Sequence, residues 1–167
     1  MSTPPQLTPK YRRGAALALL GWLILCFAVA EVASIFSAHG AAWYSGLVKP
    51  RLNPPDGLFA VFWSALLCGL MAIAAWLVGR TRPSSCRTRG LLLFLVQLWF
   101  NLLWSWIFFN QHQIATAFFD LVALWAALLL TILNFRKVSR TAAWLLTPYL
   151  AWAAFAAYVN LDLWRLN

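Results

Sequence analysis

Five apolar segments, each close to 20 residues long and almost free of charge, run through this sequence. An α-helix needs about 20 apolar residues to cross the hydrocarbon core of a bilayer. A membrane barrel would instead show segments of about ten residues with alternating hydrophobicity. The pattern therefore predicts five membrane-spanning helices, at about residues 14–36, 57–79, 90–109, 113–135 and 141–161.

The composition also indicates that the protein is surrounded by membrane lipid. Of the 167 residues, 63% are hydrophobic and only 10% are charged, and a water-soluble domain of this size could not bury so much apolar surface. We therefore expect an all-α integral membrane protein, with a basic N-terminal segment at 1–13 and a single five-helix domain at 14–167. A signal peptide is an alternative reading of the first segment, because basic residues precede an apolar run that reaches Ala28-Val29-Ala30. The run continues to Phe36, which favours a retained helix.

The net charge of +9 is unevenly distributed. With five crossings, ten cations lie on the N-terminal side of the membrane, and only Lys49, Arg51 and Arg165 lie on the other. Cytoplasmic loops carry an excess of Lys and Arg, so we expect a cytoplasmic N-terminus and an external C-terminus. The charge thus reflects topology and contact with membrane lipid, and we expect no nucleic-acid partner.

The connection at residues 37–56 is the only long one. Pro50, Pro54 and Pro55 stiffen it, and long loops in compact domains are often functional. The alternative is a plain connector whose Trp43 and Tyr44 belong to an interfacial aromatic belt.

Polar residues inside the apolar segments are the first site candidates. Gln97 and Asn101 stand four residues apart, so they share one helix face, and Trp104 extends that stripe. Amides at this depth must find partners, either as hydrogen bonds between helices or as the lining of a pocket. The carboxylate of Asp120 marks a functional site by default, although a protonated structural Asp is the alternative.

Depth along the helices brings several of these residues together. At about 1.5 Å per residue, Trp63, Asn101 and Asp120 all lie in the half of the bilayer nearest the long loop. Trp152 and Ala156 share one face of the last helix, beyond Pro148, which can bend it. The sequence therefore predicts a cavity lined by indoles and amides beneath the cationic loop, suited to flat apolar rings with a peripheral anionic group.

Signals for catalysis or metal binding are weak. The sequence shows no Ser/His/Asp set, paired carboxylates, phosphate-binding loop or His/Cys cluster. Cys26, Cys68 and Cys86 lack zinc-ligand or redox spacing, which favours inert thiols. His39 and His112 could ligate a haem iron, but solvated loop histidines are the favoured reading. We expect no metal site and no required cofactor.

Three motifs, "WYSGLVKPRLNPP", "VQLWFNLLWSWIFF" and "LLTPYLAWAAFAAYVN", resemble the translocator protein family (TspO/MBR, the tryptophan-rich sensory or peripheral benzodiazepine receptor family). The resemblance spans about residues 14–167. It implies a five-helix membrane protein, often a homodimer, that binds porphyrins such as protoporphyrin IX and haem in a pocket closed by the first loop. It also suggests a bacterial membrane.

The expected function is that of a porphyrin receptor in tetrapyrrole transport, sensing or regulation. One alternative is a light- and oxygen-dependent porphyrin-degrading enzyme that uses Trp63 and Trp152. A second is a transporter of sterols or small lipids, although Leu161 stands where animal members carry the Tyr of a cholesterol motif. Thr116 also replaces a pocket Trp of animal members.

Motif positions and the residue pattern together give these ligand-binding candidates: Tyr44, Lys49, Phe59, Ala60, Trp63, Gln97, Asn101, Trp104, Asp120, Trp152 and Ala156.

Overall fold

A computed structural model describes residues 9–53 and 68–167 of the chain, with side chains from residue 14 onward. Its elements are α1 (Pro9–Ser45), α3 (Cys68–Gly79), α4 (Ser85–Ser105), the π-helical turn η2 (Trp106–Asn110), α5 (Ile114–Val138) and α6 (Arg140–Leu166). These ranges contain no strand. Within the described residues, four helices are long and apolar enough to cross a membrane, and the described part of α3 is a shorter apolar segment. The predicted all-α membrane bundle is confirmed.

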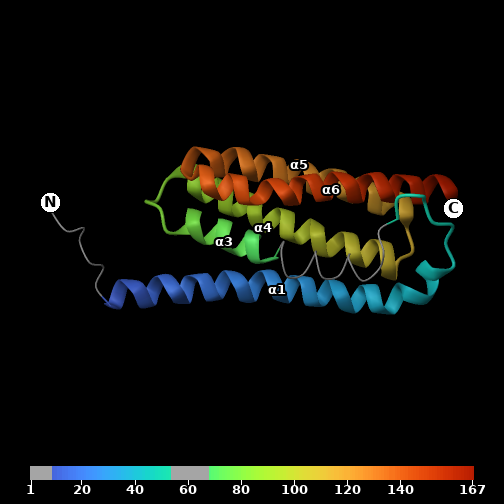
Figure 1. Ribbon diagram of the computed structural model, residues 1–167, viewed down its shortest axis with the longest axis horizontal. Helices are drawn as coiled ribbons and strands as arrows, with labels where there is room; N and C mark the ends of the chain where they lie inside the picture. Colours follow the sequence, from blue (N-terminus) through green and yellow to red (C-terminus); the bar gives the residue numbers. More distant parts are fainter. Residues whose placement is uncertain (1–8, 54–67) are drawn as a thin grey trace.

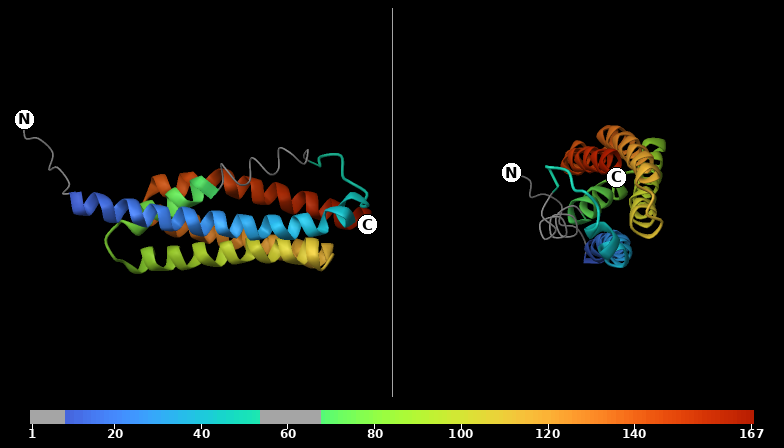
Figure 2. Two further views of the ribbon diagram at one scale, coloured as in Figure 1. Left: turned by 90° about the horizontal axis from the view of Figure 1, so that it is seen from below. Right: turned by 90° about the vertical axis from the view of Figure 1, so that its right-hand side faces the viewer.

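The helices run along one long axis (Figure 1). In chain order, α4 packs against α5 and α5 packs against α6. Seen end-on, α3 lies between α1 and α6, and α1 stands at one side of the bundle (Figure 2). The bundle thus has α4, α5 and α6 as one closely packed layer, with α3 and α1 laid against it.

Capping side chains define two of the helix starts. Ser84 accepts a hydrogen bond from the Arg87 backbone N–H at 3.2 Å, and Ser139 accepts one from Ala142 at 3.3 Å. Serine is a favoured N-cap residue because its hydroxyl satisfies an otherwise unpaired backbone donor. These caps explain why α4 begins at Ser85, before the predicted start near residue 90.

The predicted end of the first helix was wrong. The helix continues past Phe36 to Ser45, so the connection predicted at residues 37–56 begins only at Gly46. Residues 37–45 contain no proline, and the drop in hydrophobicity there marks the edge of the apolar run, not the end of the helix. For the same reason α5 and α6 continue to Val138 and Leu166, past the predicted ends at 135 and 161.

The second predicted helix, at 57–79, is described only in part. Its last section is α3, which ends at Gly79 as predicted, and residues 57–67 lie outside the described residues.

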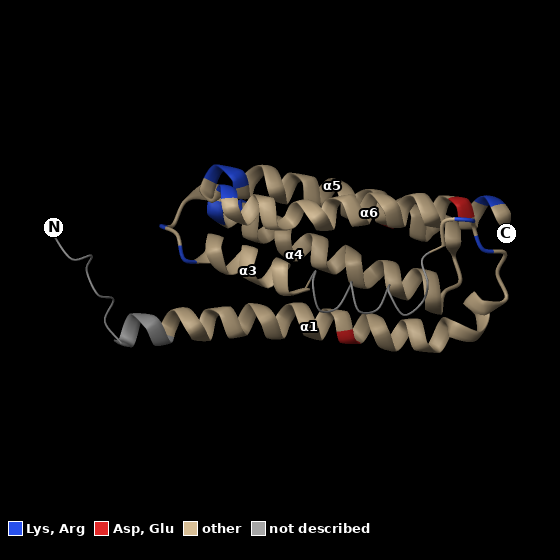
Figure 3. Ribbon diagram, viewed as in Figure 1, with Lys and Arg blue, Asp and Glu red and all other residues tan. Residues whose placement is uncertain are grey.

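Charge distinguishes the two ends of the bundle (Figure 3). The end where α4 begins and α5 ends carries seven of the described cations, and we call it the basic end. The opposite end carries the connection at residues 46–53 and the end of α6, and we call it the loop end; its cations are Lys49, Arg51 and Arg165. The basic end has Arg80, Arg82, Arg87, Arg89, Arg136, Lys137 and Arg140.

The half of the bundle near the basic end is tightly packed. Phe94 is fully buried between Trp22, an edge-on neighbour at 5.6 Å, and Phe135, a stacked neighbour at 6.1 Å between ring centroids. The indole N–H of Trp76 donates to the Ala15 carbonyl at 2.8 Å and fixes α3 to the start of α1. Small buried residues of α3, such as Ala72 and Ala75, let the helices approach closely.

Gly40 is a close-packing position on α1. A Cβ atom there would lie 2.6 Å from the Phe109 carbonyl oxygen and 2.7 Å from its Cβ. The glycine therefore serves the contact between α1 and η2 and does not break the helix.

We expect Gly40→Ala to lower the melting temperature of the purified protein. The clash with Phe109 costs about 1–3 kcal/mol, which exceeds the gain in helix propensity of about 1 kcal/mol. Gly21→Ala is the matched control, because a Cβ at Gly21 meets nothing within 4 Å. It should leave the melting temperature unchanged or raise it. Equal melting temperatures for the two variants would contradict the packing role of Gly40.

Candidate functional site

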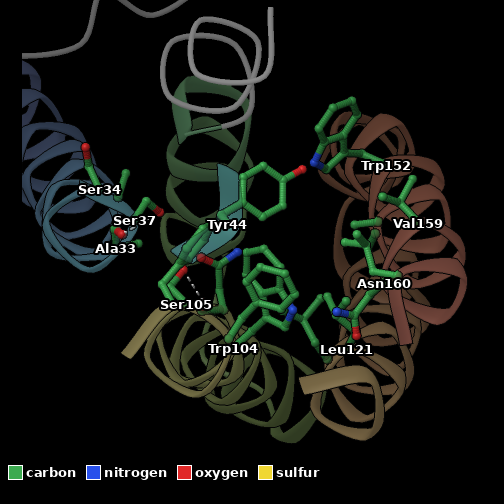
Figure 4. Close-up of a pocket in the computed structure, with 18 of the residues that line it drawn as sticks. Ala33, Ser34, Ser37, Tyr44, Trp104, Ser105, Leu121, Trp152, Val159 and Asn160 are labelled. Carbon is green, nitrogen blue, oxygen red and sulfur yellow. Dashed lines mark hydrogen bonds between the residues drawn. The ribbon is translucent and has the colours of Figure 1, made fainter. Parts of the chain in front are cut away.

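A cavity of about 550 Å³ occupies the half of the bundle near the loop end (Figure 4). Side chains from α1, α4, η2, α5 and α6 form its wall. Aromatic rings dominate the described part of the wall, and they come from Phe27, Tyr44, Trp104, Phe108, Phe109, Trp152 and Phe155. Such a wall provides large flat apolar surfaces for a ligand.

The floor of the cavity is a hydrogen bond between two buried side chains. The Asn101 amide of α4 donates to the Tyr149 hydroxyl of α6 at 2.9 Å. Asn101 also lines the cavity, whereas Tyr149 belongs to the packed half. Both groups are nearly inaccessible, at 5% and 1% exposed, so this bond closes the cavity between α4 and α6.

The π-helical turn shapes one side of the cavity. It gives a wider backbone spacing, with the Gln111 N–H donating to the Trp106 carbonyl at 3.2 Å. As a result Phe108 and its neighbour Phe109 both face the cavity. Phe108 stacks on Trp104 at 5.3 Å between centroids and meets Phe109 edge-on at 4.9 Å.

The described part of the loop is fixed to both neighbouring helices. At the end of α1, the Tyr44 hydroxyl donates to Asn53 Oδ1 at 2.8 Å, and Lys49 Nζ lies 4.8 Å from the centre of the Tyr44 ring. The Val48 N–H donates to Asn167 Oδ1 at 3.0 Å, and Asn167 Nδ2 donates back to the Val48 carbonyl at 3.1 Å. These contacts hold Lys49 at the cavity wall.

Six predicted site residues come together on the wall. Tyr44 and Trp152 point toward one another across the cavity (Figure 4). The full set is Tyr44, Lys49, Asn101, Trp104, Trp152 and Ala156. Whether each contacts a ligand stays a prediction.

Two other predicted residues are buried but do not line the described cavity. Gln97 lies one turn from Asn101 toward the basic end, below the floor, with its Nε2 4.0 Å from the Met71 sulfur. Asp120 is 7% exposed and is the residue before the wall residue Leu121. Its side chain therefore leaves the helix at about 100° from that of Leu121. Phe59, Ala60 and Trp63 lie outside the described residues.

The histidines lie away from the cavity wall. His112, with a positive φ of 57°, stacks on Trp43 at 4.3 Å between centroids. The ring nitrogen Nδ1 of His39 lies 2.8 Å from the Ile35 carbonyl oxygen of its own helix. Both side chains have local protein contacts, which favours a structural role over haem ligation.

Asn160 is a wall residue absent from the sequence-based candidates. It follows Trp152 by eight residues and Ala156 by four, so it continues their helix face, and that spacing could have identified it. Glu31 of α1 also lines the cavity.

The fold and the site define a polytopic membrane protein with an internal aromatic cavity. The family model described as "TspO/MBR family" matches residues 22–165. The chain therefore belongs to the TspO/MBR family, as its motifs indicated.

Individual relatives cover most of the chain. "Tryptophan-rich protein TspO" of Chlorobaculum tepidum is 40% identical over 144 residues, which is 86% of this chain and 91% of the relative. "Protein CrtK" of Rhodobacter capsulatus is 34% identical over 87% of this chain and 90% of its own length. "Translocator protein" of Ovis aries is 35% identical over 77% of each chain.

We expect Tyr149→Phe to destabilise the protein by about 1–3 kcal/mol, because it removes the buried partner of the Asn101 amide. Thermal unfolding in detergent measures this. Tyr158→Phe is the matched control, since Tyr158 lies on the same helix but is 45% exposed. It should change stability by less than about 0.5 kcal/mol. A Tyr149→Phe protein as stable as the control would show that the bond contributes nothing.

We expect Asn167→Ala to speed hydrogen exchange in residues 46–53, because the Val48 N–H loses its acceptor. Exchange followed by mass spectrometry measures this, and the melting temperature should hardly change since the contact is exposed. Arg165→Ala, at a 68% exposed side chain on the last turn of the same helix, should leave the exchange unchanged. Unaltered exchange in Asn167→Ala would contradict the attachment of the loop.

Proposed function

We propose that this protein binds a porphyrin, such as protoporphyrin IX or haem, in the cavity at the loop end. The observation that carries the proposal is the aromatic wall around a space of about 550 Å³, within the range of small-molecule sites. Flat conjugated rings stack favourably on indole and phenyl faces, and Trp104, Trp152 and Phe108 provide such faces. Lys49 at the loop end supplies a cation for a peripheral carboxylate.

Binding serves tetrapyrrole transport, sensing or regulation under this proposal. The names of relatives support a role of this kind: "Tryptophan-rich sensory protein" of Cereibacter sphaeroides is 33% identical, and "Translocator protein" is the name of the mammalian relatives. These names describe those proteins. For this chain they favour recognition or movement of a ligand.

We further propose that the loop end faces away from the cytoplasm. Seven described cations gather at the basic end and three at the loop end (Figure 3). The positive-inside rule then places the basic end in the cytoplasm. A ligand would accordingly approach the cavity from the external side.

The test is a titration with protoporphyrin IX, followed by quenching of tryptophan fluorescence and by the porphyrin absorption band. We expect Trp152→Leu to weaken binding about tenfold or more, because it removes an aromatic face of the wall. Trp144→Leu is the matched control on α6, since Trp144 is 73% exposed and is not among the wall residues. It should bind like the wild type. The proposal fails if the wild type does not bind porphyrin, or if both variants bind equally well.

A further inference from the structure

An open hollow lies at the basic end, at the turn between α5 and α6, so it is separate from the aromatic cavity at the loop end. Its lining consists of Arg136 and Lys137 from the last turn of α5, Arg140 from the start of α6, and Leu133 about one turn earlier on α5. All four side chains are exposed. Figure 3 shows the cations gathered where α5 ends and α6 begins. Three positive charges therefore share one small space.

The described part of the chain supplies no negative charge to this hollow. Its acidic residues are Glu31, which lines the aromatic cavity, Asp120, in the second turn of α5 at the loop end, and Asp162, which lies 3.9 Å from Arg165 near the end of α6. The side chains of the three cations in the hollow form no ion pair, hydrogen bond or cation–π contact with another described residue. Their charges are thus unbalanced by the described protein.

Helix dipoles account for two of these cations but not for the third. Arg136 and Lys137 lie in the last turn of α5, where the partial negative charge of the helix end favours cations. Arg140 is the first residue of α6, where the partial positive charge disfavours one, and the first turn of α6 contains no acidic residue. An anion held beside Arg140 would offset both the side-chain charge and the positive end of the helix.

Membrane topology does not account for the cluster either. The positive-inside rule explains why cations gather at one end of the bundle, but it does not require them to share a hollow. Arg82 and Arg89 are exposed at the same end and do not line it. Arg80 instead lies over the Trp76 ring, at 4.5 Å from its centre. The arrangement at the turn between α5 and α6 therefore calls for a reason of its own.

Exposed apolar side chains continue from the cations toward the middle of the bundle. Leu133 is 45% exposed and precedes Arg136 by three residues. Trp144 is 73% exposed and follows Arg140 by four residues, so it shares that face of α6 about 6 Å farther along the helix. Cations at the edge of a membrane-spanning segment with apolar side chains below them match a molecule that has an anionic head and apolar chains.

We propose that the hollow between α5 and α6 binds the headgroup of an anionic phospholipid. Its phosphate accepts hydrogen bonds from the guanidinium groups of Arg136 and Arg140 and from the Lys137 ammonium group, and its acyl chains pass along Leu133 and Trp144. Basic pockets between membrane helices recognise such headgroups, and guanidinium groups suit phosphate oxygens. The inference does not rest on porphyrin binding, because it concerns the other end of the bundle.

The experiment titrates the purified full-length protein in detergent with phosphatidylglycerol, and native mass spectrometry counts the lipids retained by each chain. Phosphatidylcholine with the same acyl chains is the zwitterionic comparison. We expect one phosphatidylglycerol to be retained per chain, at least about tenfold more tightly than phosphatidylcholine. The triple variant Arg136→Gln/Lys137→Gln/Arg140→Gln should lose this preference. Each single substitution should weaken phosphatidylglycerol binding about fivefold.

A charge-matched control separates a site from general attraction. Arg82→Gln/Arg87→Gln/Arg89→Gln removes the same three charges from the same end, but none of these residues lines the hollow, so the preference for phosphatidylglycerol should remain. Inorganic phosphate is the second control. At the concentration of the lipid it should not displace phosphatidylglycerol, because it makes no contact with the apolar side chains.

The outcomes are distinct. Equal retention of the two lipids by the wild type overturns the inference, and so does an equal loss of preference in the two triple variants, since that loss reports net charge alone. Displacement by inorganic phosphate assigns the hollow to small anions and also overturns it. If the triple variant at the hollow does not fold, Lys137→Gln and Arg140→Gln compared with Arg82→Gln decide. A wild type that retains phosphatidylglycerol but binds no porphyrin overturns the proposed function and supports this inference.

Discussion

The hydrogen bond between Asn101 and Tyr149 links α4 to α6 at the inner boundary of the cavity. In lipid a buried polar side chain has no water to bond, so its partner must come from the protein. The Asn101 amide donates to the Tyr149 hydroxyl at 2.9 Å and thereby links α4 and α6, which both pack on α5. Toward the basic end, small and apolar side chains close the interior, and toward the loop end the same helices enclose a cavity.

Rigid contacts at both ends of α1 keep that cavity open. At the basic end Trp76 bonds to the Ala15 carbonyl, and at the loop end Gly40 lets α1 approach Phe109 so closely that no side chain fits between them. Between these contacts, residues of α1 such as Ser34 and Ser37 line the cavity. The first helix therefore forms one side of the cavity and is fixed at both ends. Its contact with η2 lies beyond the apolar run, so α1 extends past that run to make the contact.

The order of the helices in the described part of the chain could be predicted from the sequence, because the length of an apolar run directly reports a membrane crossing. The helix ends could not, since Ser84 and Ser139 cap helices outside the apolar runs. The burial of Gln97 and Asn101 followed from their spacing, but the hydrogen bond that Asn101 makes depends on Tyr149, whose position requires the packing of α6. The π-helical turn at Trp106–Asn110 has no signal in the sequence, and it is what brings both Phe108 and Phe109 to the wall.

Polarity alone also could not sort the three buried amides, because their roles depend on what each one meets. Gln97 lies beside Met71, Asn101 bonds to Tyr149, and Asn160 lies on the cavity wall with both polar atoms of its amide buried and unpaired among the described residues. Pairing does not follow from burial, because the Oε1 atom of Gln97, which does not line the cavity, is unpaired among the described residues just as both amide atoms of Asn160 are.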